Sequence, residues 1–281
     1  MKSKPSVIRE FLLWWFGPPY SPWVSTSVAI DFSDSRAYLD ALAQTEGPRI
    51  SIQHLLIAAL GRALLDFPDA NSRIIGGKIV PSEQVSVAMP VNLLGHKGGA
   101  EKELSAAIVD RADTRSLRDI AARTRSTVKE ERDGRVTNPL GRWLARGIKH
   151  LPGPAVRRSL DLMDRASQKR PIAEQLFAQM PITTGLTNPG ATLADQEGIL
   201  FRGAAINLPG RLMHLGTVWA ISAVQDEVIP IGGVPTVRPM LPVVLIFDHR
   251  LIDGVRASQL ILRLRQILGD PAAVFGSDGH G

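Results

Sequence analysis

The chain has 281 residues, of which 44% are hydrophobic and 21% are charged. That balance is ordinary for a soluble globular protein, and the length allows one large core or two small ones. The chain has no cysteine, which excludes a disulfide framework, a thiolate nucleophile and a cysteine metal site. Because a chain without cysteine fits a reducing compartment, we expect a cytoplasmic protein.

The net charge of +6 is unevenly distributed. Between Arg135 and Arg170 there are nine Lys or Arg and two Asp or Glu, so the rest of the chain is close to neutral. A basic segment can meet nucleic acid, anionic lipid, an acidic partner or the phosphates of a nucleotide. A solvated basic face shows the same pattern.

The N-terminal apolar run Phe11–Phe16 follows basic residues. It is too short to span a bilayer, which takes about 20 residues. It also lacks a cleavage site of small residues, so we do not interpret it as a signal peptide. No other stretch of the sequence is long and apolar enough to predict a transmembrane segment.

The first elements are a strand and two helices. Residues Val24–Asp31 alternate between apolar and polar side chains, as a half-buried strand does. Ser33 or Asp34 can cap a helix that runs to about Gln44. Residues Ile52–Phe67 carry apolar side chains around most of a helix, so this helix should be largely buried, and the next residue, a proline, ends it.

Three short strands and a helix follow. The helix starts at Asp113 or Thr114 and runs to about Arg132. The strands are expected near Ser72–Ile75, Val85–Val91 and Leu104–Val109.

Residues 138–180 predict a basic helical hairpin inserted into the domain. Helical patterns in this segment are broken near Leu151–Pro154 and at Pro171, and apolar positions alternate with arginines. Such amphipathic helices can lie on a membrane surface. A helix that packs on its own domain or on a neighbouring subunit shows the same pattern, so both interpretations stay open.

The last third of the chain predicts strands and a final helix. Gly232-Gly233 is a plausible hairpin turn. The helix Gly254–Leu268 has four side chains available to the core, from Val255, Leu260, Leu264 and Leu268. The expected strands are Thr183–Thr187, Met213–Val224 and Val234–Phe247.

The most informative string is Phe247-Asp248-His249-Arg250-Leu251-Ile252-Asp253-Gly254. It places His249 at the end of an apolar strand and Asp253 four residues later, where a helix begins. A strand fixes the backbone and a turn aims the side chain, so this is a good position for a catalytic base.

The string DHRLIDG resembles the DHRxxDG signature of the dihydrolipoyl acyltransferase catalytic domain, a relative of chloramphenicol acetyltransferase. Three further strings resemble that family in the same order: LLIAALGRALLDFPDAN, VSVAMPVNLLG and TTGLTNPG. The resemblance implies an α/β fold (an α+β sandwich) like that of chloramphenicol acetyltransferase, with a mixed central sheet flanked by helices. It implies one acyltransferase domain over residues 1–281.

The resemblance also implies roles for the residues of this turn. The His249 imidazole would deprotonate the acyl acceptor directly, without an acyl-enzyme. Asp253 would be structural, through an ion pair with an arginine that holds the turn, and Arg9 is the candidate partner. Arg250 and Gly254 would support the turn.

A second turn, Thr187-Asn188-Pro189-Gly190, matches the SNxG turn of the family. Thr187 would donate a hydrogen bond to the oxyanion of the tetrahedral intermediate, as the serine hydroxyl of the family does. Asn188 and Gly190 would shape this turn. The remaining histidines are weaker candidates: His54 lies in a buried helix, and His96 and His214 have no partner that the sequence identifies.

We therefore expect an acyltransferase that moves an acyl group from acyl-coenzyme A to a thiol, hydroxyl or amine, including a dihydrolipoyl group. We expect a homotrimer with the site between subunits, no metal, no lipoyl attachment in this chain and no nucleic-acid partner. Two alternatives stay open: a non-catalytic scaffold on the same fold, and a lipid acyltransferase at a membrane surface.

Overall fold

The computed structural model describes residues 22–93, 96, 104–135, 153–189, 199, 202–205 and 214–281. Within these residues a seven-stranded sheet has the order β1-β9-β7-β6-β4-β5, and β8 pairs with β9 alone. The strands are β1 (Trp23–Asp31), β4 (Val87–Asn92), β5 (Leu104–Val109), β6 (Thr184–Thr187), β7 (Thr217–Ile221), β8 (Gln225–Ile231) and β9 (Val234–Asp248). β6 runs parallel to both β4 and β7, and the other pairs are antiparallel, so the sheet is mixed.

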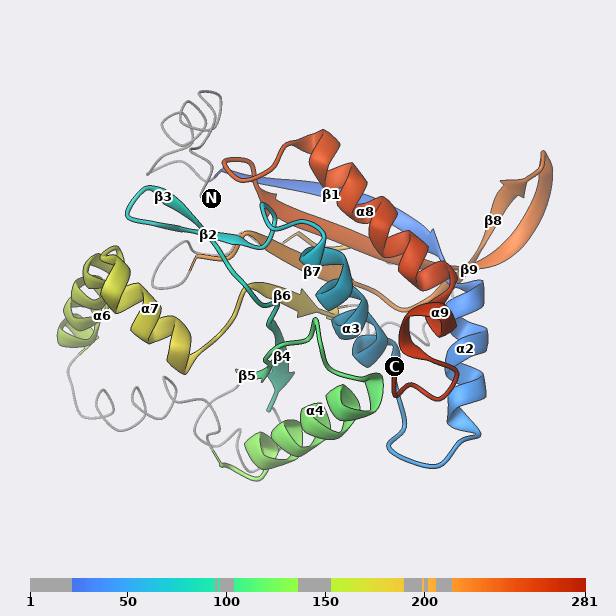
Figure 1. The fold of residues 1–281 in the computed structure, drawn as a ribbon, viewed down its shortest axis with the longest axis horizontal. Coiled ribbons are helices and arrows are strands. Elements are labelled where there is room, and N and C mark those ends of the chain that lie inside the picture. The colour runs from blue at the N-terminus through green and yellow to red at the C-terminus, as the bar shows by residue number, and fades with distance from the viewer. Residues whose placement is uncertain are drawn as a thin grey trace.

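Helices lie over one face of this sheet, and a separate ribbon of β2 and β3 lies beside it (Figure 1). α8 packs on β1 and β9, and α3 packs against both α8 and α4. The expected mixed sheet flanked by helices is therefore confirmed. The other elements are β2 (Ser72–Ile75), β3 (Lys78–Pro81), α2 (Ser33–Ala43), α3 (Ile52–Leu65), α4 (Leu117–Arg132), α6 (Gly153–Ser167), α7 (Arg170–Gln179), α8 (Gly254–Gly269) and α9 (Pro271–Phe275).

β9 is the longest strand and organises the sheet. From Met240 to Asp248 every residue is buried, which is why this stretch reads as a continuous apolar run rather than an alternating one. β1 pairs with this half along one edge, and β7 pairs with Val243–Phe247 along the other. The buried half of β9 therefore ends at Asp248, and the turn that follows starts directly from the core.

The second half of the sheet differs from its prediction in one element. The expected strand Met213–Val224 is limited to β7, and a separate strand, β8, follows it. The turn at Gly232 and Gly233 is confirmed, with φ of 57° and 84°, but it joins β8 to β9. β8 was not predicted from the sequence because it contains two acidic residues and a proline, which are uncommon in strands.

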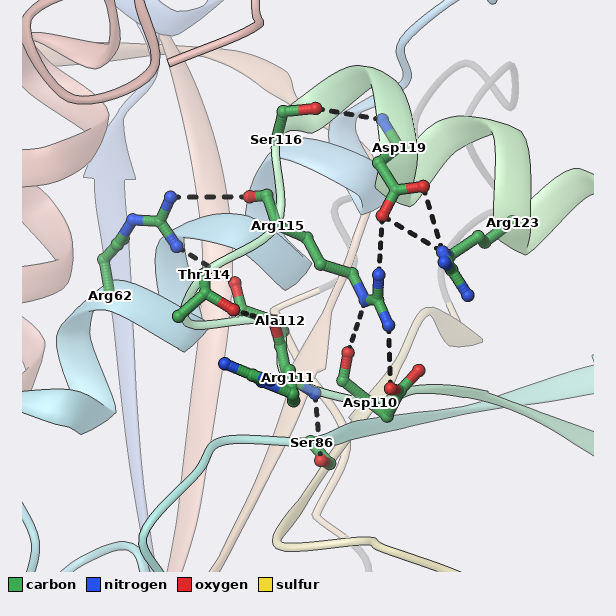
Figure 2. A network of polar contacts seen from close by, with 10 residues as sticks. All are labelled: Arg62, Ser86, Asp110, Arg111, Ala112, Thr114, Arg115, Ser116, Asp119 and Arg123. Atoms are coloured by element: carbon green, nitrogen blue, oxygen red, sulfur yellow. Dashed lines mark hydrogen bonds and ion pairs between the residues drawn. The ribbon is translucent and has the colours of Figure 1, made fainter.

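The start of α4 also differs from its prediction. The helix begins at Leu117, and its cap is Ser116, whose hydroxyl accepts a hydrogen bond from the Asp119 amide. Figure 2 shows the reason: the preceding turn has its own polar contacts. Arg62 donates to backbone carbonyls of this turn, including those of Ala112 and Asp113, and these contacts hold the turn outside the helix.

Arg115 fastens the same turn to the first turn of α4. Its guanidinium contacts the carboxylates of Asp110 and Asp119 at 2.7 and 2.8 Å (Figure 2). Hydrogen bonds and ion pairs with Arg115 and Arg123 hold the pKa of Asp119 below its usual value, although its partial burial acts in the opposite direction. These contacts have a structural role, because they hold the first turn of α4 against the turn that precedes it.

Two helices of the predicted insert, α6 and α7, lie in the described part of the chain. The Arg73 guanidinium on β2 lies 3.7 Å from the centre of the Phe177 ring on α7. At the β2–β3 turn, a Cβ on Gly76 would stand 2.6 Å from the carbonyl oxygen of Gln168. This part of the insert therefore packs on its own domain, whereas 138–152 lies outside the described residues.

Helix Ile52–Leu65 is buried as expected, and His54 is one of its core residues. Burial, together with the charge of Arg125, lowers the pKa of His54 to about 4. In α8, Leu260, Leu264 and Leu268 enter the core as predicted, but Val255 is 71% exposed. None of the described helices has the length and apolar composition that crossing a membrane requires.

Candidate active site

The turn that carries His249 is held by backbone hydrogen bonds on both sides. The Asp248 amide donates to the Gly216 carbonyl, and the His249 amide donates to the Pro22 carbonyl, both at 3.0 Å. The Leu251 amide donates back to the Asp248 carbonyl at 2.9 Å and closes the turn. The position of the His249 backbone is therefore set by the residues that precede β1 and β7.

The side chain of Asp248 makes a second set of contacts inside this turn. It is fully buried, and Arg250 donates to it from its backbone amide at 2.9 Å and from its guanidinium Nη2 at 2.6 Å. His214 Nε2 lies 2.6 Å from Oδ2 of the same carboxylate, the oxygen that also accepts from Arg250 Nη2. Burial alone would raise the pKa of Asp248, but hydrogen bonds from His214 and Arg250 and the charge of Arg250 hold it below its usual value.

The His249 ring leaves the turn next to Phe247, with 6.0 Å between the ring centres. Its Nδ1 atom is buried. The imidazole ring of histidine can accept a proton, so a histidine held at this point can act as a general base. His249 is thus the first residue after the buried end of β9.

Asp253 lies at the start of the helix that follows the turn. It is exposed and caps α8, with its Oδ1 accepting a hydrogen bond from the Arg256 amide at 2.9 Å. Within the described residues no ion pair of Asp253 is seen, and Arg9 lies outside them, so that pairing stays a prediction. Gly254 is the first residue of α8.

Two arginines near the turn form ion pairs with acidic residues other than Asp253. Arg250 pairs with Asp248, and Arg256 on α8 grips Asp69 with contacts of 2.7 and 3.2 Å. The Arg256 guanidinium also lies 4.2 Å from the centre of the Phe67 ring. The Phe67–Asn71 turn thereby fixes the start of α8.

Thr187 is the last residue of β6, and the register separates it from His249. Thr187 pairs with Ala220 on β7, and Ala220 pairs with Val244 on β9. His249 lies five residues beyond Val244, which is roughly 16 Å along the strand, and two strand spacings add about 10 Å across the sheet. Within one chain the two residues are not brought together.

The rest of the Thr187 turn is only partly described. Asn188 is half-buried, and Gly190 lies outside the described residues. Sequence reasoning assigned no role to three residues that contact the turn or the start of α8, namely His214, Asp69 and Arg256. Asp69 stands inside a string that resembled the family, but no local pattern connects His214 with Asp248, because the two meet only after β7 and β9 have paired.

Comparison with known proteins identifies the family to which the sequence is similar. The model of the family "2-oxoacid dehydrogenases acyltransferase (catalytic domain)" matches residues 20–139 and 202–276. The unmatched stretch between them, residues 140–201, contains Thr187 and all but the first two residues of the insert.

Two curated relatives show the same relationship over most of the chain. A lipoamide acyltransferase component of the branched-chain alpha-keto acid dehydrogenase complex from Bacillus subtilis is 23% identical over 88% of this chain and 46% of its own length. A dihydrolipoyllysine-residue succinyltransferase component of the 2-oxoglutarate dehydrogenase complex from Escherichia coli is 21% identical over 85% of this chain and 46% of its own length. The chain thus spans about half the length of the curated relatives it matches.

Solved structures show the fold. The cubic core of the pyruvate dehydrogenase multienzyme complex has a TM-score of 0.63 at 17% identity, covering 98% of this chain and 93% of that one. A chloramphenicol acetyltransferase has a TM-score of 0.57 at 13% identity, covering 95% of this chain and 100% of that one. With the family model matched over more than half of its residues, the chain belongs to the 2-oxoacid dehydrogenases acyltransferase (catalytic domain) family.

Proposed function

We propose that this protein is a coenzyme A-dependent acyltransferase in which His249 is the general base. His249 takes the proton of the acceptor, whose heteroatom then attacks the carbonyl carbon of the acyl thioester. The tetrahedral intermediate collapses by breaking its bond to the sulfur of coenzyme A, which leaves with the proton held by His249. The acyl group is transferred in one attack, and the base returns to its neutral form.

The observation that carries this proposal is the position of His249. Its backbone amide is bonded to Pro22, its neighbours Asp248 and Arg250 are joined by an ion pair, and its Nδ1 is buried. A base held in this way needs little reorganisation during the reaction, and proton transfer by a positioned side chain contributes about 10²–10⁴-fold to the rate.

We further propose that the site is completed by a second copy of the chain in a homotrimer. Thr187 is the candidate oxyanion donor, and the register keeps it far from His249 of its own chain. A closed ring of identical head-to-tail contacts can bring the Thr187 edge of one subunit to the His249 end of the next.

The arm formed by β8 and the first half of β9 supports this assembly. It extends beyond the rest of the sheet (Figure 1), and its side chains at Val228, Val234 and Val237 are 66%, 62% and 63% exposed. Apolar side chains grouped on a projecting hairpin favour burial against another subunit. This arm is a candidate part of the trimer contact.

A dihydrolipoyl thiol is the first acceptor to test, because the curated relatives are named as lipoamide and dihydrolipoyllysine-residue acyltransferase components. The assay measures release of coenzyme A from acetyl-, succinyl- and branched-chain acyl-coenzyme A in the presence of dihydrolipoamide, with hydroxyl and amine acceptors in parallel. We expect turnover with at least one pair and its loss in His249→Ala. Absence of turnover with every pair would contradict the proposal and favour the non-catalytic scaffold.

A further inference from the structure

His214 lies beside the His249 turn and bridges two elements that are far apart in the sequence. Its Nδ1 is 3.0 Å from the backbone nitrogen of Ile74 on β2, and its Nε2 is 2.6 Å from Oδ2 of Asp248. Its ring stacks near that of Trp23, with 6.2 Å between the centres and 23° between the planes. The side chain is only 7% exposed, so both polar contacts are made away from solvent.

The two contacts assign the proton on the ring. The Ile74 amide can only donate, so Nδ1 of His214 must present a lone pair to it. In a neutral imidazole with an accepting Nδ1, the proton is on Nε2. His214 therefore donates its Nε2 proton to the Asp248 carboxylate, in a short charge-assisted hydrogen bond.

Asp248 does not need His214 for neutralisation of its charge. Arg250 already spans the carboxylate, with Nε 3.0 Å from Oδ1 and Nη2 2.6 Å from Oδ2. The guanidinium and the carboxylate belong to the same turn, however, so this pair alone cannot anchor the turn to the rest of the domain. The backbone amides of Asp248 and His249 anchor the main chain, and His214 anchors the Asp248 carboxylate, because its other nitrogen accepts a hydrogen bond from β2.

We propose that His214 is a positioning residue for His249 and that it acts as the neutral Nε2–H tautomer. It donates to Asp248 and thereby fixes the plane of the carboxylate and, through it, the direction in which the next residue leaves β9. This role rests on the proposed function of His249 as the base. A reacting group misplaced by about 1 Å can lose about 100-fold in rate, so orientation at this distance from the chemistry has a measurable effect.

Three substitutions at His214 separate positioning from simple structural support. His214→Gln places an amide nitrogen near the position of Nε2 and keeps the donor to Asp248. His214→Asn places an amide oxygen near the position of Nδ1 and keeps the acceptor for the Ile74 amide. His214→Phe keeps the ring and removes both. The first two variants each lose one buried hydrogen bond, so they are a matched pair for stability.

We expect His214→Gln to keep kcat within about threefold of wild type, whereas His214→Asn and His214→Phe lose about tenfold or more with little change in KM. We also expect the ¹⁵N shifts of His214 in the wild-type protein to show a protonated Nε2 and an unprotonated Nδ1. Equal kcat values for the Gln and Asn variants, or a proton on Nδ1, would overturn the positioning role.

His249→Ala in the same assay separates this inference from the proposed function. If His249→Ala is inactive and all three His214 variants turn over like wild type, the base assignment stands and the positioning role is wrong. If His249→Ala keeps near-normal turnover, both are wrong. The ¹⁵N measurement needs no substitution, so a variant that fails to fold leaves the inference testable.

Discussion

Thr187 and His249 lie at opposite ends of the central strands of one chain. Thr187 pairs with Ala220 on β7, which pairs with Val244 on β9, and His249 is five residues further along. The resulting separation of roughly 16 Å along the strands is too large for an oxyanion donor and a base that serve one carbonyl group. If both residues act in the reaction, they act across an interface between two copies.

Mixing two inactive variants tests this shared site. His249→Ala and Thr187→Ala chains, unfolded together and reassembled at equal amounts, should regain activity because some interfaces combine an intact His249 with an intact Thr187. In a randomly mixed ring about one quarter of the interfaces do so, and we expect about that share of wild-type turnover. A fully active monomer by light scattering, or no recovery in correctly assembled mixtures, would contradict the shared site.

His249→Ala should lower turnover by about 10²–10⁴-fold, because a positioned base contributes that much to the rate. The thermal midpoint should change little, since the backbone contacts of the turn do not involve the ring. The control is His280→Ala, which changes an exposed histidine near the C-terminus and should leave turnover unchanged.

Thr187→Ala should lower kcat more than it raises KM, because an oxyanion donor acts mainly in the transition state. Thr187→Ser keeps the hydroxyl and should restore most of the rate. A change confined to KM in the alanine variant would assign Thr187 to substrate binding instead.

Asp253→Ala should reduce stability by about 1 kcal/mol, the usual contribution of a helix cap. Asp253→Asn should have a much smaller effect, because an amide oxygen can accept the same hydrogen bond from the Arg256 amide. Urea unfolding of the two variants measures the difference. Equal losses in both would show that the charge of Asp253 matters more than its capping, as an ion pair with an arginine requires.

The Asp248 network predicts a loss of stability in acid. The pKa of Asp248 is lowered in the folded protein, so the unfolded chain binds a proton at higher pH than the folded chain does. The stabilisation is fully present above the ordinary pKa of 3.8 and is lost as the pH falls through the lower folded value. The difference in thermal midpoint between wild type and Asp248→Asn should therefore become smaller as the pH is lowered from 6 to 3.

The control for that comparison is Asp119→Asn, since Asp119 also has a lowered pKa but lies at the start of α4. At neutral pH Asp248→Asn should destabilise the protein by about 3–5 kcal/mol, because it leaves the largely buried guanidinium of Arg250 without its charged partner. Asp119 is partly exposed, so its substitution should have a much smaller effect. Parallel pH profiles for wild type and Asp248→Asn would contradict the assignment.

Phe177→Ala should destabilise the protein by about 1–2 kcal/mol, because it removes an aromatic ring that packs under the Arg73 guanidinium. Leu162→Ala on α6 is the control, since that side chain is 70% exposed. Differential scanning fluorimetry measures both. If neither variant changes stability while Leu162→Ala weakens binding to anionic vesicles, the membrane-surface interpretation of the insert gains over intramolecular packing.

The sequence alone determined most of the elements, although not β8, and it also determined the identity of the histidine turn. Strand β1, helix α3 and helix α8 follow from local periodicity, and the string that ends β9 carries both the proposed base and the helix cap within eight residues. Such features are readable because their causes act between residues that are close together along the chain.

Only the tertiary structure decided which polar groups meet around that turn. His214 and Asp248, or Asp69 and Arg256, are far apart in the sequence, and no local pattern marks them as partners. The separation of Thr187 from His249 likewise depends on the order and register of three strands. Strand pairing sets these distances through hydrogen bonds between remote segments, and for that reason the sheet rather than the motif determines how the site is assembled.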